Sequence, residues 1–428
     1  MKSAVIICLS FFCASQPFAQ LSRENIYTDF VLYQRRVKFD KYMREKTIKE
    51  AFTLPLDSNT EYRYESACRA ISQFMLQSQE IKNGIDKMLL HYDSLQYSTK
   101  RDLLEVLYGV YPETHTATMK RLLAKETEPK LFAIEVLYLF AADTSKNNIR
   151  FLQKQTDKQF PAYDTLDILQ ELKKYLSNHN KLIQEQTPHL NELFANQKLL
   201  AKKIIYSFQR WNRDYPGLAI IQNADGSFAR DSLGKLWMFG ELARAASNLP
   251  YFITNGNTPQ GIYSIQRVDT AHNNFIGPTP NIQLVMPYEA DSFYWHCDYD
   301  SSKDAVSNYL DLLPPSWRVY EPITESFYAG KMGRTEIIAH GTTLDPEYFK
   351  GKPFYPFTPT LGCLCAKEIW NITTGKFLQS EQYNLVNAFL STPGDTGYLF
   401  VINLDNKQKS VSQREIEEWV NAFEKNTE

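Results

Sequence analysis

The sequence predicts an α + β protein in two parts, a helical N-terminal region and a mainly β C-terminal region. Up to about Ser207, apolar residues recur at three- and four-residue spacing with few Gly or Pro residues, which is typical of amphipathic helices. From about Trp211, apolar runs shorten to strand length and Gly, Pro and Asn become frequent. The 428 residues and the 43% hydrophobic fraction are enough for two or three domains with substantial cores.

Residues 1–20 have the three-part pattern of a secretory signal peptide. Lys2 gives a basic start, Ala4 to Phe12 form an apolar core, and small residues lie near Ala19. The apolar core is too short to span a bilayer, and no later run approaches the roughly 20 apolar residues that a membrane span needs. We therefore expect cleavage after Ala19 or Gln20 and a periplasmic or extracellular protein with no membrane span.

Residues 21–207 are expected to form a helical domain of repeated hairpins. The sequence Glu-Val-Leu-Tyr at 105–108 recurs thirty residues later at 135–138, and each copy is followed by a breaker and a second apolar helix. Such hairpins stack edge to edge because none buries its apolar stripe alone, as in HEAT-like arrays. We expect this domain to position the protein on a protein partner or on the cell wall.

Residues 208–428 are expected to form a second domain that is mostly β. Turn residues at 223–226 and 255–257 separate runs with the composition of strands. The predicted strands include Leu218–Gln222, Asn281–Met286 and Tyr398–Asn403, and the predicted helices are Glu381–Leu390 and Glu415–Lys425.

Nucleic acid is not expected as a partner. The 47 basic and 49 acidic residues nearly cancel, so the chain has no strong field to attract phosphates. No aromatic-basic motif of the kind found in nucleic-acid-binding modules is present either.

Four cysteines remain after the expected leader, namely Cys68, Cys297, Cys363 and Cys365. Four is too few for a disulfide-built scaffold in a chain of this size. If Cys363 is a free thiol, at least one other cysteine must also be unpaired. A bond between Cys297 and Cys365 is one arrangement that this leaves open.

Two short segments of the β-rich region combine the residue types of a thiol active site. The apolar strand 337–339 ends in His340, and residues 360–363 read Thr-Leu-Gly-Cys. A thiolate is the nucleophile of cysteine enzymes, and a neighbouring imidazole can accept its proton. Gly362 lets the backbone approach a substrate, so that amides near Cys363 can hold an oxyanion. We predict Cys363 as nucleophile and His340 as base, with Thr360 orienting the imidazole.

These segments resemble the signature of the L,D-transpeptidase (YkuD-like) catalytic domain family, which is a His, a short spacer and then Ser/Thr-His-Gly-Cys. Residues 258–265, Thr-Pro-Gln-Gly-Ile-Tyr-Ser-Ile, also resemble the family's Thr-Pro-x-Gly-x-Phe/Tyr-x-Ile strand, which lies upstream of the His. Three elements in the family's order are more specific than one Gly-Cys pair. The resemblance covers roughly residues 218–403 and implies a mainly β catalytic domain followed by a C-terminal helix.

The resemblance implies an enzyme that acts on peptidoglycan stem peptides without a cofactor or a metal. Cys363 would attack the carbonyl between the third stem residue and the terminal D-alanine, release D-alanine and form a thioester. An amine of a second stem peptide would then resolve the thioester into a cross-link, whereas water would make the site an L,D-carboxypeptidase. The residues that the resemblance places beside the substrate are Gly341, Thr342, Pro259, Gly261, Tyr263 and Arg334.

The chain departs from the family pattern at three points. Leu361 stands where the family has its second His, and Cys365 stands where an Arg usually follows the nucleophile. The spacer of nineteen residues before Thr360 is slightly long. The backbone amide of Leu361 remains, so a main-chain oxyanion hole can survive. Arg334 or Lys367 is the candidate to replace the missing cation near the thiolate.

Two other functions fit parts of the sequence. A catalytically inactive wall-binding or scaffold protein would explain Leu361 and Cys365 as decay of the site. Zinc binding is another alternative, because His296-Cys297 together with the pair at 363 and 365 offers four ligand residues. The two pairs lack a recognised zinc-finger spacing, however, and Gly362 is better explained by a catalytic turn.

Overall fold

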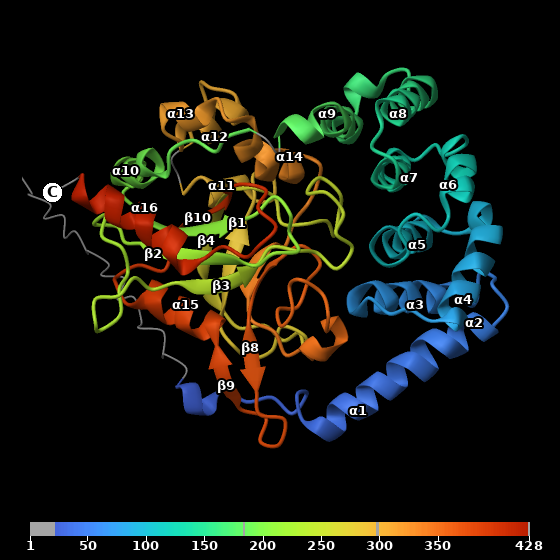
Figure 1. The fold of residues 1–428 in the computed structure, drawn as a ribbon, viewed down its shortest axis with the longest axis horizontal. Helices are drawn as coiled ribbons and strands as arrows, with labels where there is room; N and C mark the ends of the chain where they lie inside the picture. Colours follow the sequence, from blue (N-terminus) through green and yellow to red (C-terminus); the bar gives the residue numbers. More distant parts are fainter. Residues whose placement is uncertain (1–21, 183–184, 297–298, 427–428) are drawn as a thin grey trace, which may run out of the picture.

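The computed structural model describes residues 22–182, 185–296 and 299–426. The expected signal peptide at 1–20 and Cys297 lie outside the described residues. The chain is α + β, as predicted: an arc of helices borders a closed barrel of eight strands (Figure 1). None of the helices within the described ranges is both long and apolar enough to cross a membrane.

The helical arc begins with α1, which continues through the π-helical segment Met43–Glu50 into α2. Ser78 and Ser145 cap α4 and α8 by accepting hydrogen bonds from backbone amides in the first turn. Pro129 begins α7, where its missing N–H removes no helical hydrogen bond. The helices of the arc are α1 (Tyr33–Tyr42), α2 (Ala51–Thr53), α3 (Glu61–Phe74), α4 (Gln79–Leu90), α5 (Tyr97–Val110), α6 (Thr116–Leu123), α7 (Pro129–Ala142), α8 (Lys146–Gln159) and α9 (Asp167–Leu182).

The two copies of the Glu-Val-Leu-Tyr sequence lie in α5 and α7, and each is followed by a second helix, α6 or α8, as predicted. α7 is buried almost along its whole length because it packs against α5, α6, α8 and α9. Its sequence is apolar on all sides, which fits a helix with neighbours all round. Glu105 and Glu135, the acidic residues of the two copies, are both buried.

Eight strands close the barrel in the order β1, β10, β4, β5, β6, β7, β3 and β2. The pairs β1 with β10 and β6 with β7 are parallel, and the other neighbours are antiparallel. β8 and β9 form a separate two-stranded sheet. The strands are β1 (Lys203–Gln209), β2 (Gly217–Gln222), β3 (Phe239–Leu242), β4 (Gly261–Asp269), β5 (Asn281–Val285), β6 (Ile338–His340), β7 (Leu364–Ala366), β8 (Glu368–Trp370), β9 (Phe377–Ser380) and β10 (Gly397–Asn403).

Further helices surround the barrel. Four of them, α11 to α14, are inserted between β5 and β6, and α16 ends the described chain (Figure 1). The predicted helices at 381–390 and 415–425 are confirmed as α15 and α16, and the predicted strands as β2, β5 and β10. The helices are α10 (Leu190–Leu200), α11 (Asp291–Tyr294), α12 (Ala305–Asp311), α13 (Pro315–Arg318), α14 (Glu325–Lys331), α15 (Glu381–Leu390) and α16 (Gln413–Lys425).

Residues from all eight strands meet in one apolar core, which is the interior of the barrel. Ile205 and Ile265 belong to this core, as do Ala339 and Leu364 from β6 and β7. Tyr206, one position after Ile205, packs outward in a second core with α10 and α16. Both faces of β1 are therefore buried, because successive side chains of a strand point to opposite faces.

The boundary between the two parts lies earlier than the predicted position at residue 207. β1 is a barrel strand, and α10 before it packs on the outside of the barrel. The run 204–206 is apolar throughout because both faces are covered, and such a run does not distinguish a strand from a buried helix. At the other end, Ile26 and Val31 pack with Trp370 and Phe377 of β8 and β9. The first described residues therefore belong with the β-rich part.

A loop between β3 and β4, residues 245–257, joins the barrel to the arc. Leu249, Phe252 and Ile253 of this loop are part of the apolar core of the helices. Asn255 donates a hydrogen bond of 3.1 Å to the buried carboxyl of Glu105 in α5. The helical arc thus holds the 245–257 loop in place.

Candidate active site

His340 and Cys363 lie on two neighbouring parallel strands. His340 ends β6 and is paired in register with Cys365 of β7, and Cys363 directly precedes β7. Ala339 and Leu364 point into the core of the barrel. Because side chains alternate along a strand, His340 and Cys365 lie on the outer face, and Cys363, two positions before Cys365, follows the same alternation. The predicted base and the predicted nucleophile are thus brought to one face of the barrel.

Cys363 is half-buried as a residue, while burial of its thiol is the largest influence on the pKa of this group. Its Sγ donates a weak hydrogen bond of 3.5 Å to the carbonyl oxygen of Glu336, and among the described residues no hydrogen bond joins it to His340. Burial raises the pKa of the thiol above its ordinary value, while the Ile338 amide and the Arg334 guanidinium act in the opposite direction. The resting site therefore holds a neutral thiol.

The imidazole of His340 is held in one tautomer. Its Nδ1 lies 2.5 Å from the carbonyl oxygen of Gly341, which can only accept, so Nδ1 carries the proton. Nε2 then carries the lone pair, and it forms no hydrogen bond to any residue in the described part of the chain. Burial lowers the pKa of His340 to about 4. At neutral pH the ring is therefore uncharged and able to accept a proton at Nε2.

Gly362 is required by the turn before the thiol. Its φ of +118° lies in the region that favours glycine, and a Cβ there would collide with the guanidinium of Arg334. It would also lie 2.8 Å from the carbonyl oxygen of Gly256. Thr258, from the Thr-Pro-Gln-Gly segment, donates a hydrogen bond of 2.9 Å to the Gly362 carbonyl. Segments far apart in the sequence therefore fix this turn together.

Thr360 stabilises the same turn. The prediction that it orients the imidazole of His340 is wrong. Its Oγ1 accepts a hydrogen bond of 3.0 Å from the Gly362 amide and donates one of 2.9 Å to the Cys363 carbonyl. Since both contacts are local, the hydroxyl is used within residues 360–363. The Gly362 amide is engaged by this contact as well, so an oxyanion would need other donors.

Arg334 is a buried cation beside the thiol. Its guanidinium donates to three backbone carbonyls, those of Tyr251, Gly256 and Asn257, the last two at 2.9 and 2.8 Å. It makes no ion pair with any described acidic residue. Burial lowers its pKa to about 10, so the group stays charged at neutral pH. Of the two cations proposed to replace the family's Arg, Arg334 acts on the pKa of Cys363.

Three residues expected beside the substrate are buried in the structure. Tyr263 is wholly buried, and its hydroxyl donates a hydrogen bond of 2.7 Å to the carbonyl oxygen of Pro259. Gly261 has a φ of +139°, and a Cβ there would collide with Ser326. Gly261 and Tyr263 belong to β4, which forms part of the barrel wall, and Pro259 precedes this strand. They offer no exposed group to a ligand.

Gly341 and Thr342 lie against a buried carboxyl group, that of Glu368. A Cβ on Gly341 would collide with this carboxyl, and the Thr342 amide donates a hydrogen bond of 2.9 Å to it. Burial raises the pKa of Glu368 to about 7. Gly341 and Thr342 are therefore also too buried to contact a substrate. Glu368 was not predicted as a site residue, and the only signal for it in the sequence is that a charged residue stands in a largely apolar segment.

Cys365 is a poor candidate for the nucleophile although it is the register partner of His340. It is 1% exposed, and burial raises the pKa of its thiol to about 12. Cys68, Cys363 and Cys365 are free thiols, and a bond to Cys297 concerns a residue outside the described ranges. The described residues contain no group of three or more His, Cys, Asp or Glu side chains placed to hold a metal ion.

Two acidic residues near the thiol were not predicted. Glu336, whose carbonyl accepts from Cys363, has a φ of +61°, which is uncommon for a residue with a side chain. Its amide donates a hydrogen bond of 2.8 Å to the carboxyl of Glu289. Leu361, where the family has its second His, is 51% exposed beside this site. No pattern in the sequence signals the backbone of Glu336, because its conformation depends on contacts with a distant segment.

Comparison with known proteins gives no relative. No protein-family model, no curated protein and no solved structure matches the chain. The function must therefore be inferred from the geometry of the site and from the sequence.

Proposed function

We propose that this protein is a cysteine-dependent L,D-transpeptidase that acts on peptidoglycan stem peptides. The observation that supports the proposal is that Cys363, a half-buried residue, directly precedes the strand next to the one that ends in an uncharged imidazole, that of His340. The Nε2 lone pair of His340 has no described partner, while its Nδ1 is held by the Gly341 carbonyl. A base that is fixed at one nitrogen and open at the other is what general-base activation of a thiol needs.

In the proposed reaction, Nε2 of His340 takes the thiol proton as Sγ attacks the carbonyl between the third stem residue and D-alanine. A C–S bond forms, the amide C–N bond breaks, and the imidazolium returns the proton to the departing D-alanine amine. An amine of a second stem peptide then attacks the thioester. A new C–N bond forms, the C–S bond breaks and the thiol regains its proton.

The thiol must leave the Glu336 carbonyl before it can give its proton to His340. This contact is weak because a thiol is a poor hydrogen-bond donor, so its loss costs little. Catalytic hydrogen bonds are often long or absent without substrate and form only when substrate is bound. Arg334 would stabilise the thiolate as it forms, since its charge has no described acidic partner.

The proposal is tested by incubating the purified protein with disaccharide-tetrapeptides and measuring released D-alanine together with cross-linked dimers. Release should be abolished in Cys363→Ala and in His340→Ala. Cys365→Ala is the matched control, because it removes the neighbouring thiol that is 1% exposed, and it should retain activity. Release that persists in Cys363→Ala, or no release from the folded native protein, would overturn the proposal. Products without dimers would identify an L,D-carboxypeptidase that uses the same thiol.

A catalytically inactive wall-binding protein is the second candidate. The observation in its favour is the exposed Leu361 in place of a His, next to a thiol that bonds to a backbone carbonyl. This candidate predicts that the protein sediments with purified sacculi, that Cys363→Ala binds equally well, and that D-alanine is not released. Both candidates place the protein in the periplasm or outside the cell, and both assign the helical arc to contacts with a protein partner or the wall.

A further inference from the structure

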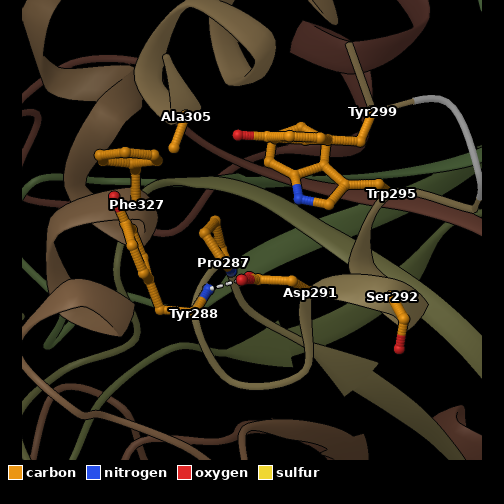
Figure 2. A pocket seen from close by; sticks show the side chains of 8 residues that line it. All are labelled: Pro287, Tyr288, Asp291, Ser292, Trp295, Tyr299, Ala305 and Phe327. Carbon is orange, nitrogen blue, oxygen red and sulfur yellow. Dashed lines mark hydrogen bonds between the residues drawn. The ribbon is translucent and has the colours of Figure 1, made fainter. Parts of the chain in front are cut away.

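A cavity of about 400 Å³ lies where the helices inserted between β5 and β6 meet the end of β5. Figure 2 shows Phe327 and Tyr288 along one side of this cavity. The rings of Trp295 and Tyr299 line another side, and the carboxylate of Asp291 lies between the two pairs. The volume falls within the range of roughly 300–1,000 Å³ that is usual for sites of small ligands.

The aromatic walls consist of rings that contact one another in pairs. The ring centroids of Tyr288 and Phe327 are 5.2 Å apart in an edge-to-face arrangement. Those of Trp295 and Tyr299 are also 5.2 Å apart. Trp295 is 5% exposed, whereas Tyr288 and Tyr299 are 43% and 44% exposed. The cavity therefore has a buried aromatic wall and an open, aromatic rim.

The charge of the cavity is negative. Asp291 accepts a hydrogen bond of 3.1 Å from the Tyr288 amide, and it forms no ion pair with any cation that the structure describes. Lys331, whose charge lowers the pKa of Tyr288 against the effect of burial, donates a hydrogen bond of 2.8 Å to Asp167 of the helical arc. Among the described residues, the carboxylate in the cavity therefore has no counter-ion.

We propose that this cavity binds a small organic ammonium ion, such as an alkylated or quaternary amine. The faces of Trp and Tyr rings attract cations, and several rings around one space are the usual way in which proteins recognise quaternary ammonium groups. The carboxylate of Asp291, which has no described counter-ion, adds a second attraction for positive charge and repels anions. A neutral ligand of the same shape would gain only the burial of its apolar surface.

The cavity wall is connected to the thiol site. Tyr288 and Asp291 flank Glu289, whose carboxyl accepts hydrogen bonds from the amides of Met286 and Glu336 at 3.0 and 2.8 Å. A ligand in the cavity therefore contacts the segment that positions the Glu336 backbone. The ammonium site itself does not depend on the proposed transpeptidase reaction, so binding can be tested without an activity measurement.

The experiment uses choline and its neutral isostere 3,3-dimethylbutan-1-ol, in which carbon replaces the charged nitrogen. Both are titrated into the purified protein and followed by calorimetry and by ligand-observed NMR. Choline should bind about tenfold more tightly than the alcohol, as expected for a cation against several aromatic faces. Equal affinities of the two ligands, or no saturable binding of choline, would overturn the proposal.

Three variants locate the binding. Asp291→Asn keeps an oxygen that can accept from the Tyr288 amide but removes the charge, and it should weaken choline binding about fivefold. Tyr299→Leu should weaken it similarly because it removes one ring of the rim. Phe293→Leu is the control, since this ring lies on the same short helix, is 62% exposed and does not line the cavity. Choline binding that is unchanged in both Asp291→Asn and Tyr299→Leu, or lost in Phe293→Leu, would contradict the site.

Discussion

The guanidinium of Arg334 occupies the space that a side chain on Gly362 would need. The same guanidinium bonds to three carbonyls of the 245–257 loop and acts on the pKa of the Cys363 thiol. One buried cation thus links the thiol, the turn before it and the loop that the helical arc holds.

Replacing Gly362 by Ala should destabilise the protein and displace Arg334. The φ of +118° is itself costly for Ala, by about 1–3 kcal/mol, and the new Cβ would also collide with the guanidinium. Chemical denaturation should show the lower stability. Gly351→Ala is the control, because Gly351 also has a positive φ, +85°, but has open space around it. An equal loss of stability in the two variants would mean that a Cβ at position 362 does not collide with Arg334.

Replacing Arg334 by Met should raise the pKa of the Cys363 thiol, because the favourable charge is lost. The Lys variant keeps a charge and should raise it less. The measurement is the pH dependence of alkylation, with the Cys363 peptide quantified by mass spectrometry so that other cysteines do not interfere. Arg334→Met also leaves three buried carbonyls unpaired, which should lower stability by about 1–3 kcal/mol for each one that finds no water. An unchanged alkylation profile would remove Arg334 from the proposed mechanism.

The imidazole of His340 should titrate near pH 4 in the folded protein. Its folded-state pKa is depressed to about 4 from an ordinary value of 6.5, so the unfolded chain binds more protons between these pH values. The stability that the neutral ring contributes is therefore lost as the pH falls from 6.5 to 4. NMR of the ring protons, assigned by their loss in His340→Gln, measures this directly. A midpoint near 6.5, or an imidazolium that persists at pH 7 beside a thiolate, would contradict the neutral resting pair.

Ionisation of the Glu105 carboxyl group should make the protein less stable as the pH rises from about 4.5 to 7. Burial raises its folded-state pKa to about 7, so the folded protein holds a proton that the unfolded chain releases in this window. Glu105→Gln keeps an oxygen for the bond with Asn255 but cannot ionise. Relative to the native protein, the variant should gain up to about 3 kcal/mol between pH 5 and pH 8, measured by denaturant unfolding. Glu45 is exposed, so Glu45→Gln is the control and should show no such gain. If the difference in unfolding free energy between Glu105→Gln and the native protein did not change with pH, the raised pKa of Glu105 would be refuted.

The sequence allowed prediction of the elements whose pattern is local. β2, β5 and β10 have strand-length apolar runs near turn residues, and α15 and α16 have helical spacing, so each was predicted close to its place. β1 was assigned to the helical part because its two buried faces leave no alternation to read. In the helical region, the two repeated hairpins α5–α6 and α7–α8 were predicted from the recurring sequence, whereas the curvature of the arc depends on long-range packing.

The site was predictable in its residue types and not in its contacts. His340 and Cys363 were chosen from two short motifs, and the strand pair β6 and β7 brings them to one face. Thr360 bonds within its own turn instead of to the imidazole. The burial of Tyr263 in the barrel and the contact of Cys363 with the Glu336 carbonyl depend on segments that are distant in sequence. Periodicity and spacing carry no information about such contacts. Arg334 was proposed as a replacement cation, but its burial among backbone carbonyls could not be read from the sequence.

The 245–257 loop connects two barrel strands and at the same time completes the apolar core of the helical arc. Leu249, Phe252 and Ile253 leave the barrel to enter the core of the arc, and Arg334 bonds to the same loop from the other side. A shortened protein made of the barrel alone would expose these apolar side chains to water. The loop that bonds to Arg334 would also lose the contacts that hold it in place. Substitutions that disrupt α5, although they lie far from the reacting atoms, are therefore expected to abolish activity as substitutions in the barrel strands would.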